Sequence, residues 1–255
     1  MTFFSPYRHE FLRVAACVPR IEIGDPDFNV ARTLELAREG DKRKIGVMIF
    51  PELGMSAYAI DDLLFQDVLL DRVEKAVDDV AQATQHLFPV LVIGAPLRRR
   101  GQLFNCAIVM HRGRILGAVP KIYLPNYREF YEERHCTSGA GIREAGIDIA
   151  GRTVPFGIDL MFCSKGSVPF TAHVEICEDV WVPQPPSTAA ALAGAEILLN
   201  LSASNITIGK ADTRRLLCAS QSSRCIAAYA IRPRARANPP PIWPGTVTPP
   251  SSNTA

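Results

Sequence analysis

Three ionisable side chains follow apolar segments of this chain, at positions where an extended strand would end. Glu52 comes after IGVMIF and a proline, Lys121 comes after ILGAVP, and Cys177 ends HVEIC. Functional residues of α/β proteins gather at strand ends. There a carboxylate can act as a general base and an ammonium can stabilise an oxyanion. A thiol at such an elbow is open to reaction, unlike one inside a strand.

Each of these residues also has an ordinary structural explanation. A carboxylate after a proline commonly caps the segment that follows, and a lysine at a strand end is commonly solvated. A cysteine drawn at random from the seven in this chain is usually a packing residue. Glu175 and Glu178 beside Cys177 would raise the pKa of its thiol, because nearby negative charge disfavours the thiolate. A reactive Cys177 therefore requires a base and a cation from elsewhere in the chain.

Short apolar runs alternate with helical patterns along the chain. The predicted strands are 12–18, 45–50, 89–96, 104–111, 173–177 and 196–202. The predicted helices are 28–39, 67–86, 187–194 and 210–227. Helical spacing within the second of them relates Val68, Leu69, Val73, Val77 and Val80. The HRGR at 111–114 indicates a hairpin turn. Strands that are apolar on both faces and alternate with helices predict an α/β layered protein.

The composition is that of a globular protein with one sizeable core. The chain has 255 residues, of which 47% are hydrophobic and 21% charged, and its formal net charge is +2. Acidic and basic residues are interspersed, which indicates neither a nucleic-acid nor a membrane partner. No apolar run approaches the roughly 20 residues that span a bilayer, and the N-terminus lacks a secretory signal pattern. The seven cysteines include no CxxC pair, so we expect free thiols in a cytoplasmic protein.

The last part of the chain departs from this composition. Residues 233–255 contain seven prolines in twenty-three positions. Neither a helix interior nor a central strand accommodates proline at that density. We therefore predict one compact domain over 1–230 and a proline-rich disordered tail over 231–255.

The strand-end residues occur in the order Glu, Lys, Cys that is typical of the nitrilase superfamily, which the chain resembles from about residue 12 to residue 230. Three stretches are similar to the glutaminase domain of actinobacterial glutamine-dependent NAD+ synthetases. They are SPYRHEFLRVAAC, PKIYLPNYREFYEERHC and HVEICEDVWVPQPPSTAAALAGAEILLNLSASNITIGKADTRR. The resemblance implies a four-layer αββα sandwich of the nitrilase type, C-terminally incomplete in this chain.

The resemblance also implies a chemical mechanism. Glu52 would take the proton of the Cys177 thiol, the thiolate would attack the side-chain amide of glutamine, and Lys121 would stabilise the oxyanion. Ammonia would leave first, and hydrolysis of the thioester would then release glutamate. This chemistry requires no metal and no cofactor on this chain, and the five histidines show no metal-ligand spacing.

The same resemblance implies a set of residues around the substrate. They are Tyr127, Glu178, Trp181, Ser204 and Arg214, with Arg215 as the alternative to Arg214. Relatives can carry phenylalanine where this chain has Trp181. Many nitrilases also have a further carboxylate near the lysine, for which Glu129 and Glu133 are the candidates.

Two features separate this chain from full-length members of the family that it resembles. The SGGLDS loop of an ATP-using synthetase domain does not occur, so ATP would be used by a domain that this chain lacks. In the family, the strand that follows CIAAY leads into the string Glu-Ser-Thr-Thr-Asp-Leu-Ala-Trp-Asp-Gly. Codons can be chosen for residues 237–247 that encode this same string when they are read one base earlier. That agreement favours translation of the tail out of frame. Full-length members are expected to form homo-oligomers, and this expectation is weaker for a shortened chain.

Three functions are compatible with these patterns. The first is the glutaminase part of a glutamine-dependent NAD+ synthetase, which supplies ammonia for NAD+ biosynthesis. The second is a stand-alone carbon-nitrogen hydrolase, which would cleave ω-amides or N-carbamoyl compounds in preference to glutamine. The third is a non-catalytic remnant, in which shortening has removed activity although the three strand-end residues are intact.

Overall fold

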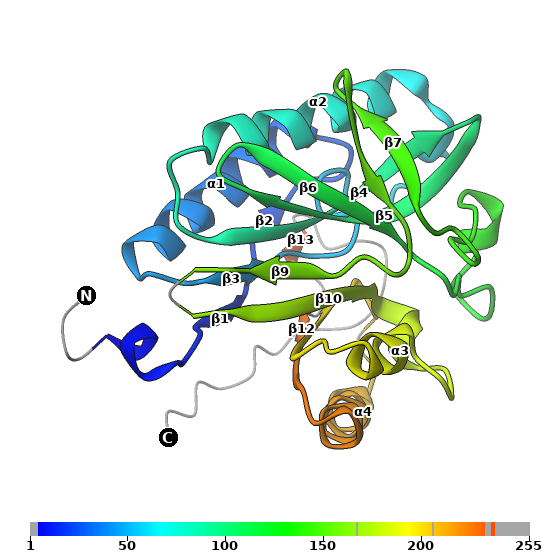
Figure 1. Ribbon diagram of the computed structural model, residues 1–255. Coiled ribbons are helices and arrows are strands. Elements are labelled where there is room, and N and C mark those ends of the chain that lie inside the picture. Colours follow the sequence, from blue (N-terminus) through cyan, green and yellow to red (C-terminus); the bar gives the residue numbers. More distant parts are fainter. Residues whose placement is uncertain (1–4, 167, 206, 233–235, 238–255) are drawn as a thin grey trace.

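The structure places two β-sheets face to face between two pairs of helices. It is a computed structural model that describes residues 5–166, 168–205, 207–232 and 236–237. In Figure 1, α1 (Pro26–Lys42) and α2 (Asp67–Ala83) lie on one side of the sheets, and α3 (Pro186–Leu192) and α4 (Lys210–Cys225) lie on the other. The predicted αββα sandwich is therefore confirmed.

The first sheet has seven strands within the described residues, in the order β1-β3-β4-β5-β6-β8-β7. These strands are β1 (Val14–Ala16), β3 (Val47–Ile49), β4 (Val90–Arg99), β5 (Gln102–His111), β6 (Arg114–Pro120), β7 (Ala145–Ile149) and β8 (Arg152–Phe156). β1, β3 and β4 are parallel, whereas β5 runs antiparallel to both β4 and β6. The predicted hairpin turn joins β5 to β6, and Arg112 and Gly113 both have the positive φ that such two-residue turns require.

The second sheet has the order β12-β11-β10-β9 within the described residues. Its strands are β9 (Phe162–Ser164), β10 (Phe170–Ile176), β11 (Ile197–Leu201) and β12 (Ala228–Arg232). β10, β11 and β12 are parallel, and β9 is an antiparallel edge strand. A separate short pair joins β2 (Arg20–Ile21) to β13 (Arg236–Ala237). Short 3-10 turns are η1 (Pro6–His9), η2 (Asp61–Phe65), η3 (Glu132–Arg134) and η4 (Cys177–Val180).

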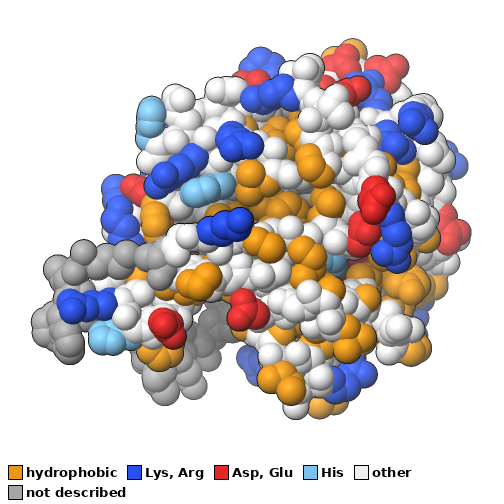
Figure 2. Space-filling model, in the orientation of Figure 1, with side chains coloured by type: hydrophobic (Ala, Val, Ile, Leu, Met, Phe, Trp, Pro, Cys, Tyr) orange, Lys and Arg blue, Asp and Glu red, His pale blue; other side chains and the backbone are white. Residues whose placement is uncertain are grey.

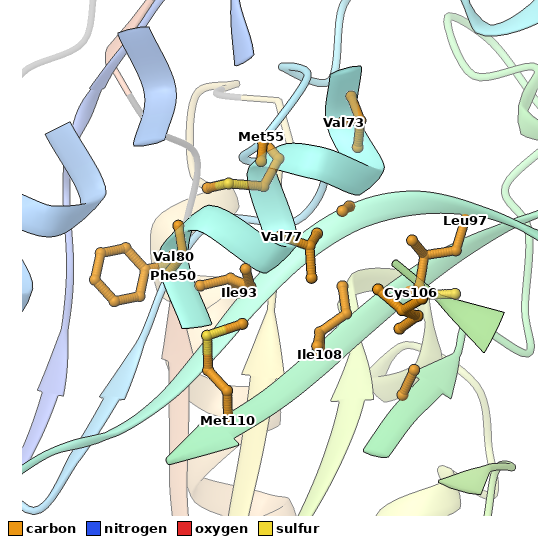
Figure 3. Close-up of a cluster of buried hydrophobic side chains, with 14 of the residues drawn as sticks. Phe50, Met55, Val73, Val77, Val80, Ile93, Leu97, Cys106, Ile108 and Met110 are labelled. Carbon is orange, nitrogen blue, oxygen red and sulfur yellow. The ribbon is translucent and has the colours of Figure 1, made fainter. Parts of the chain in front are cut away.

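Strands of the first sheet are apolar on both faces because each face is covered. Leu91 and Ile93 of β4 belong to the core that faces α2, whereas Val92 between them belongs to the core between the sheets. Figure 3 shows the core on the helix side, where Val77 and Val80 of α2 point toward β4 and β5. Alternation along a strand sends successive side chains to opposite faces, which explains the continuous apolar runs in the sequence.

The helical pattern predicted for α2 is correct at all but one of its apolar positions. Leu69, Val73, Val77 and Val80 are buried, but Val68 is 76% exposed. Each residue turns a helix by about 100°, so Val68 points away from the stripe that includes Leu69. No helix in the described ranges combines the length and apolar character of a membrane span.

Packing between the two sheets is not continuous. A cavity of about 770 Å³ lies between them, with Val109 on one wall and Val174 on the opposite wall. Hydrophobic side chains gather over the middle of the face shown in Figure 2, with charged side chains mainly around them. The inner faces of the two sheets are therefore not in contact along their whole length.

The predicted boundary between domain and tail falls inside a strand. β12 runs through Arg232, which is fully buried, whereas the boundary was placed at residue 230. Residues 236–237 of the predicted tail form β13, paired with β2. The other tail positions, 233–235 and 238–255, lie outside the described residues. Neither β9 nor the β7–β8 hairpin was predicted from the sequence. β9 has only three residues, whereas β7 and β8 do alternate between exposed and buried side chains, a pattern that the prediction missed.

Gly94 in β4 touches the segment that follows β3. A Cβ atom at this position would lie 2.4 Å from the Pro51 carbonyl oxygen and 2.8 Å from the Glu52 Cα. We expect Gly94→Ala to lower the free energy of unfolding by about 1–3 kcal/mol, because overpacking forces backbone shifts. Urea denaturation measures this change. Gly166→Ala is the control, since its Cβ would meet no atom closer than 3.5 Å. Equal midpoints for the two variants would contradict the expected clash.

Candidate active site

The three strand-end residues predicted from the sequence converge on one buried region. Glu52 follows β3 and Lys121 follows β6 of the first sheet, whereas Cys177 follows β10 of the second. Glu52 and Lys121 are each 1% exposed, and Cys177 is 6% exposed. The charges of Glu52 and Lys121 both act on the Cys177 thiol. Packing of the two sheets therefore gathers a carboxylate, an ammonium and a thiol from distant parts of the chain.

The Lys121 ammonium lies between two carboxylates. Its Nζ donates to Glu52 Oε1 over 2.7 Å, and to Glu132 Oε1 and Oε2 over 2.7 and 2.9 Å. Burial alone would lower the pKa of Lys121, but the negative charges of Glu132 and Glu52 outweigh it and hold that pKa well above its usual value. Lys121 is therefore a permanent cation in the interior.

The carboxylate that accompanies Lys121 is Glu132, and the two candidates predicted from sequence are wrong. The η3 turn directs Glu132 inward, where it also accepts a hydrogen bond from the Tyr58 hydroxyl over 2.5 Å. Glu129 accepts from Asn205 instead. Glu133 accepts from Asn126 over 3.1 Å. Burial raises the pKa of Glu132, and the charge of Lys121 opposes that rise.

The Glu52 carboxylate is oriented by three donors. Oε1 accepts from Lys121 Nζ over 2.7 Å and from Asn105 Nδ2 over 2.8 Å. Oε2 accepts from the Ala203 backbone N–H over 2.8 Å. Ala203 follows β11 of the second sheet, so Glu52 bridges the two sheets at their strand ends. This geometry fixes both oxygens of a carboxylate that could exchange a proton with a nearby group.

Cys177 adopts a backbone conformation that is rare for residues other than glycine. Its φ is 47°, in the left-handed region. Asn200 of β11 holds this turn, because its Oδ1 accepts from the Cys177 N–H over 3.0 Å. The Ser202 hydroxyl donates to Cys177 Sγ over 3.3 Å. Burial, followed by the charge of Glu52, raises the pKa of the Cys177 thiol well above its usual value, so the thiol needs a base to react.

Three of the predicted substrate residues, Tyr127, Glu178 and Trp181, lie in the segments that follow Lys121 and Cys177. The Tyr127 hydroxyl donates to Glu178 Oε1 over 2.8 Å. Trp181 faces Lys210, whose Nζ lies 5.4 Å from the Trp181 ring centroid and 5.7 Å from that of Phe130. Burial lowers the pKa of Lys210, against the opposing charge of Cys177 and nearby carboxylates. These contacts bring a carboxylate, a cation and aromatic rings together near the thiol.

The other two predicted substrate residues, Ser204 and Arg214, lie close to the thiol. Ser204 is buried, and its N–H donates to the Ser202 hydroxyl over 3.2 Å. Arg214 is partly buried, and its charge interacts with that of Cys177. Arg214 Nε has no hydrogen-bond partner among the described residues. The alternative, Arg215, is exposed and pairs with Asp212 over 3.4 Å.

A cavity of about 310 Å³ adjoins the site. It is bordered by the Glu132 carboxylate and by Phe130. Tyr58, which donates to Glu132, and Ala203, which donates to Glu52, also line it. The cavity therefore meets the ion cluster at Glu132. Within the described residues, no group of three or more His, Cys, Asp or Glu side chains is arranged to hold a metal ion.

Sequence reasoning missed several residues of the site. Glu132 lies in the three-residue η3 turn and Tyr58 in an irregular segment, and no periodicity reveals the direction of either side chain. Lys210 opens α4, where it could equally have been a solvated first-turn residue. Asn200 did carry a signal, since it is a polar residue inside the apolar run EILLNLS and such a residue must find buried partners.

Glu132 should contribute more to stability than its neighbour Glu133. We expect Glu132→Gln to lower the free energy of unfolding by about 1–3 kcal/mol, because hydrogen bonds to a buried charge are lost. Glu133→Gln should change it by less than about 0.5 kcal/mol, as is usual for an exposed position. Differential scanning calorimetry of both variants measures the difference. Similar melting temperatures would contradict the role assigned to Glu132.

The chain is similar in sequence to curated proteins named glutamine-dependent NAD(+) synthetases. The chain is 53% identical over 229 residues to the glutamine-dependent NAD(+) synthetase of Mycobacterium tuberculosis, a match that covers 90% of the chain and 34% of that relative. It is 31% identical over 209 residues to the synthetase of Aquifex aeolicus, covering 81% of the chain and 33% of the relative. The chain thus spans about a third of the length of the curated relatives it matches.

Solved structures and a family comparison agree with the fold. A glutamine-dependent NAD(+) synthetase from Cytophaga hutchinsonii superposes with a TM-score of 0.76 at 23% identity, over 87% of this chain and 37% of that one. An amidase from Nesterenkonia sp. superposes with a TM-score of 0.66 at 17% identity, over 87% and 75% of the two chains. Residues 13–237 match the carbon-nitrogen hydrolase family. Since that match includes most of the sequence, the chain belongs to the carbon-nitrogen hydrolase family.

Proposed function

We propose that this chain hydrolyses the side-chain amide of glutamine to glutamate and ammonia. The observation that carries the proposal is the buried ion pair of Glu52 and Lys121 beside the Cys177 thiol. These groups offer the base, the cation and the nucleophile of covalent amide hydrolysis. Glutamine as the substrate is supported by the curated relatives, which are named glutamine-dependent NAD(+) synthetases.

In the first half of the reaction, Glu52 takes the proton of Cys177 and the sulfur forms a bond to the amide carbon. The carbonyl oxygen becomes an oxyanion, which Lys121 stabilises. An ammonium has three N–H donors, and sharing one of them between both oxygens of Glu132 leaves one for the oxyanion. The Cys177 N–H already donates to Asn200 and so does not serve this purpose.

In the second half, the protonated Glu52 gives its proton to the leaving amine, and ammonia departs as the C–N bond breaks. A thioester on Cys177 remains. Glu52 then takes a proton from water, whose oxygen attacks the thioester carbon and releases glutamate. A return of that proton to sulfur restores the thiol. Because an amide is a poor electrophile, covalent catalysis lowers the barrier by replacing one difficult step with two easier ones.

The charged groups near the thiol match the two ends of an amino acid. In the proposal, Glu178 binds the α-ammonium, with its carboxylate oriented by Tyr127. Lys210 and Arg214 bind the α-carboxylate. Trp181 and Ser204 line the path between these ends and the thiol. Lys210 was not among the substrate residues predicted from the sequence. We include it in the proposed substrate site because its ammonium lies over the Trp181 ring.

The wider role is also part of the proposal. Ammonia from this site would supply the synthesis of NAD+, as the names of the relatives suggest. ATP would then be used by a region of the relatives that this chain does not cover, and no cofactor would be needed on this chain. The proposal places the chain in the cytoplasm, where its free cysteines would stay reduced. Homo-oligomer formation is proposed for the full-length relatives only.

Replacement of the proposed nucleophile and base should stop turnover without unfolding the chain. We expect Cys177→Ala to lower glutamine hydrolysis by at least about 10³-fold. Glu52→Gln should lower kcat by about 10²–10⁴-fold with little change in KM, because it keeps the shape and removes the base. Release of glutamate from saturating glutamine measures both effects.

Cys106→Ala is the matched control, since Cys106 is a fully buried thiol whose Sγ donates to the Phe104 carbonyl oxygen. It should retain near-parental turnover. Near-parental rates in either Cys177→Ala or Glu52→Gln would overturn the proposed chemistry. Faster cleavage of N-carbamoyl compounds or other ω-amides than of glutamine would instead identify a different amidase.

A further inference from the structure

Asp179 is a buried carboxylate that the mechanism above does not use. It lies in η4, two residues after Cys177, and is 1% exposed. Its Oδ1 accepts from the Ile122 N–H over 3.2 Å and from the Tyr123 N–H over 2.9 Å. Its Oδ2 accepts from the Ile176 N–H over 2.9 Å. A single side chain therefore holds backbone groups of two separate segments.

These two segments carry the proposed cation and nucleophile. Ile122 and Tyr123 directly follow Lys121 at the end of β6, in the first sheet. Ile176 directly precedes Cys177 at the end of β10, in the second sheet. β6 and β10 belong to different sheets and share no ladder of hydrogen bonds. The Asp179 carboxylate supplies a polar link between them at the level of the site.

We propose that Asp179 is a positioning residue that sets the distance between the Lys121 ammonium and the Cys177 thiol. The inference rests on the proposed function, because it concerns how that site is assembled. Asp179 itself touches neither the reacting sulfur nor the ammonium in the hydrogen bonds of the structure. It acts through the backbone on either side of them.

An ordinary helix cap would explain only part of this geometry. The contact with the Ile176 N–H is the usual contact of an aspartate with the start of its own turn. The two contacts with Ile122 and Tyr123 reach a segment more than 50 positions away in sequence and contribute nothing to capping η4. Burial raises the pKa of Asp179, and the N–H groups of Tyr123 and Ile176 oppose this rise.

Asparagine cannot replace this carboxylate although it has the same shape. A carboxylate accepts at both oxygens, whereas an asparagine amide accepts at one atom and donates at the other. In Asp179→Asn, the NH₂ group must face either Ile176 or the pair Ile122 and Tyr123. Either choice sets donor against donor and breaks one side of the link, while the volume of the side chain stays the same.

The test compares Asp179→Asn with Glu196→Gln in the 255-residue chain. Glu196 is the matched control, since its carboxylate accepts from the Thr171 N–H over 3.1 Å at the other end of β10. Alkylation by iodoacetate, located by mass spectrometry, reports on Cys177, with the exposed Cys163 as internal reference. This readout does not depend on which amide is the natural substrate. Steady-state glutamine hydrolysis supplies kcat and KM.

We expect Asp179→Asn to slow alkylation of Cys177 and to lower kcat by about 10–100-fold, as small misplacements of reacting groups do. KM, the alkylation of Cys163 and the protection of the buried Cys106 should stay unchanged, and so should all values for Glu196→Gln. A Cys177 that reacts within about twofold of the parental rate would overturn the proposal, because it would show that positioning needs no such link.

Amide exchange in the unmodified chain tests the link without any substitution. The Ile122 and Tyr123 amides should exchange as slowly as those of β6, although they lie beyond its end. Exchange as fast as at the exposed Arg128 would overturn the proposal. If Cys177 of the parental chain is alkylated but the chain does not hydrolyse glutamine, the proposed function fails. The alkylation and amide-exchange experiments still decide the role of Asp179 in that case.

Discussion

The Lys121 ammonium is a full positive charge in the interior, and it is stable there because two carboxylates compensate it. Transfer of an ion from water into a protein costs several kcal/mol, which only close partners with good geometry offset. Glu52 and Glu132 meet that requirement at 2.7 Å each. Because Glu52 also accepts from the Ala203 N–H, the same ion cluster fixes how the first sheet meets the second. The chemistry proposed for the site is therefore built on an interaction that also organises the fold.

The nucleophile depends on a second polar network, within the second sheet. Asn200 of β11 holds the left-handed turn at Cys177, and it donates in turn to the Tyr229 hydroxyl over 3.1 Å. Tyr229 belongs to β12 and donates to Glu175 of β10. Three neighbouring strands thus contribute one residue each to the support of a strained residue. Buried networks of this kind are stable only when every member is satisfied.

The sequence predicted two kinds of feature, namely elements with a periodic apolar pattern and residues at the ends of strands. The paired apolar faces of β4 and β5, the helical stripe of α2 and the turn at Arg112 and Gly113 all follow from periodicity and turn chemistry. The strand-end positions of Glu52, Lys121 and Cys177 follow from the same patterns. Glu132 was not predicted, because no periodicity marks the direction of its side chain and Glu129 and Glu133 were equally plausible by type. The η3 turn and the ion pair with Lys121 together determine where the Glu132 side chain points.

The most direct test is an experimental structure of the chain after reaction with an electrophilic glutamine analogue. We expect one adduct, bonded to Cys177. The carbonyl oxygen that takes the place of the glutamine amide oxygen should lie within hydrogen-bond distance of Lys121 Nζ, and Glu52 should still be paired with that ammonium. The analogue's α-carboxylate should face Lys210 or Arg214. An adduct on another cysteine, or a Cys177 adduct whose oxygen points away from Lys121, would contradict the central role given to the buried ammonium.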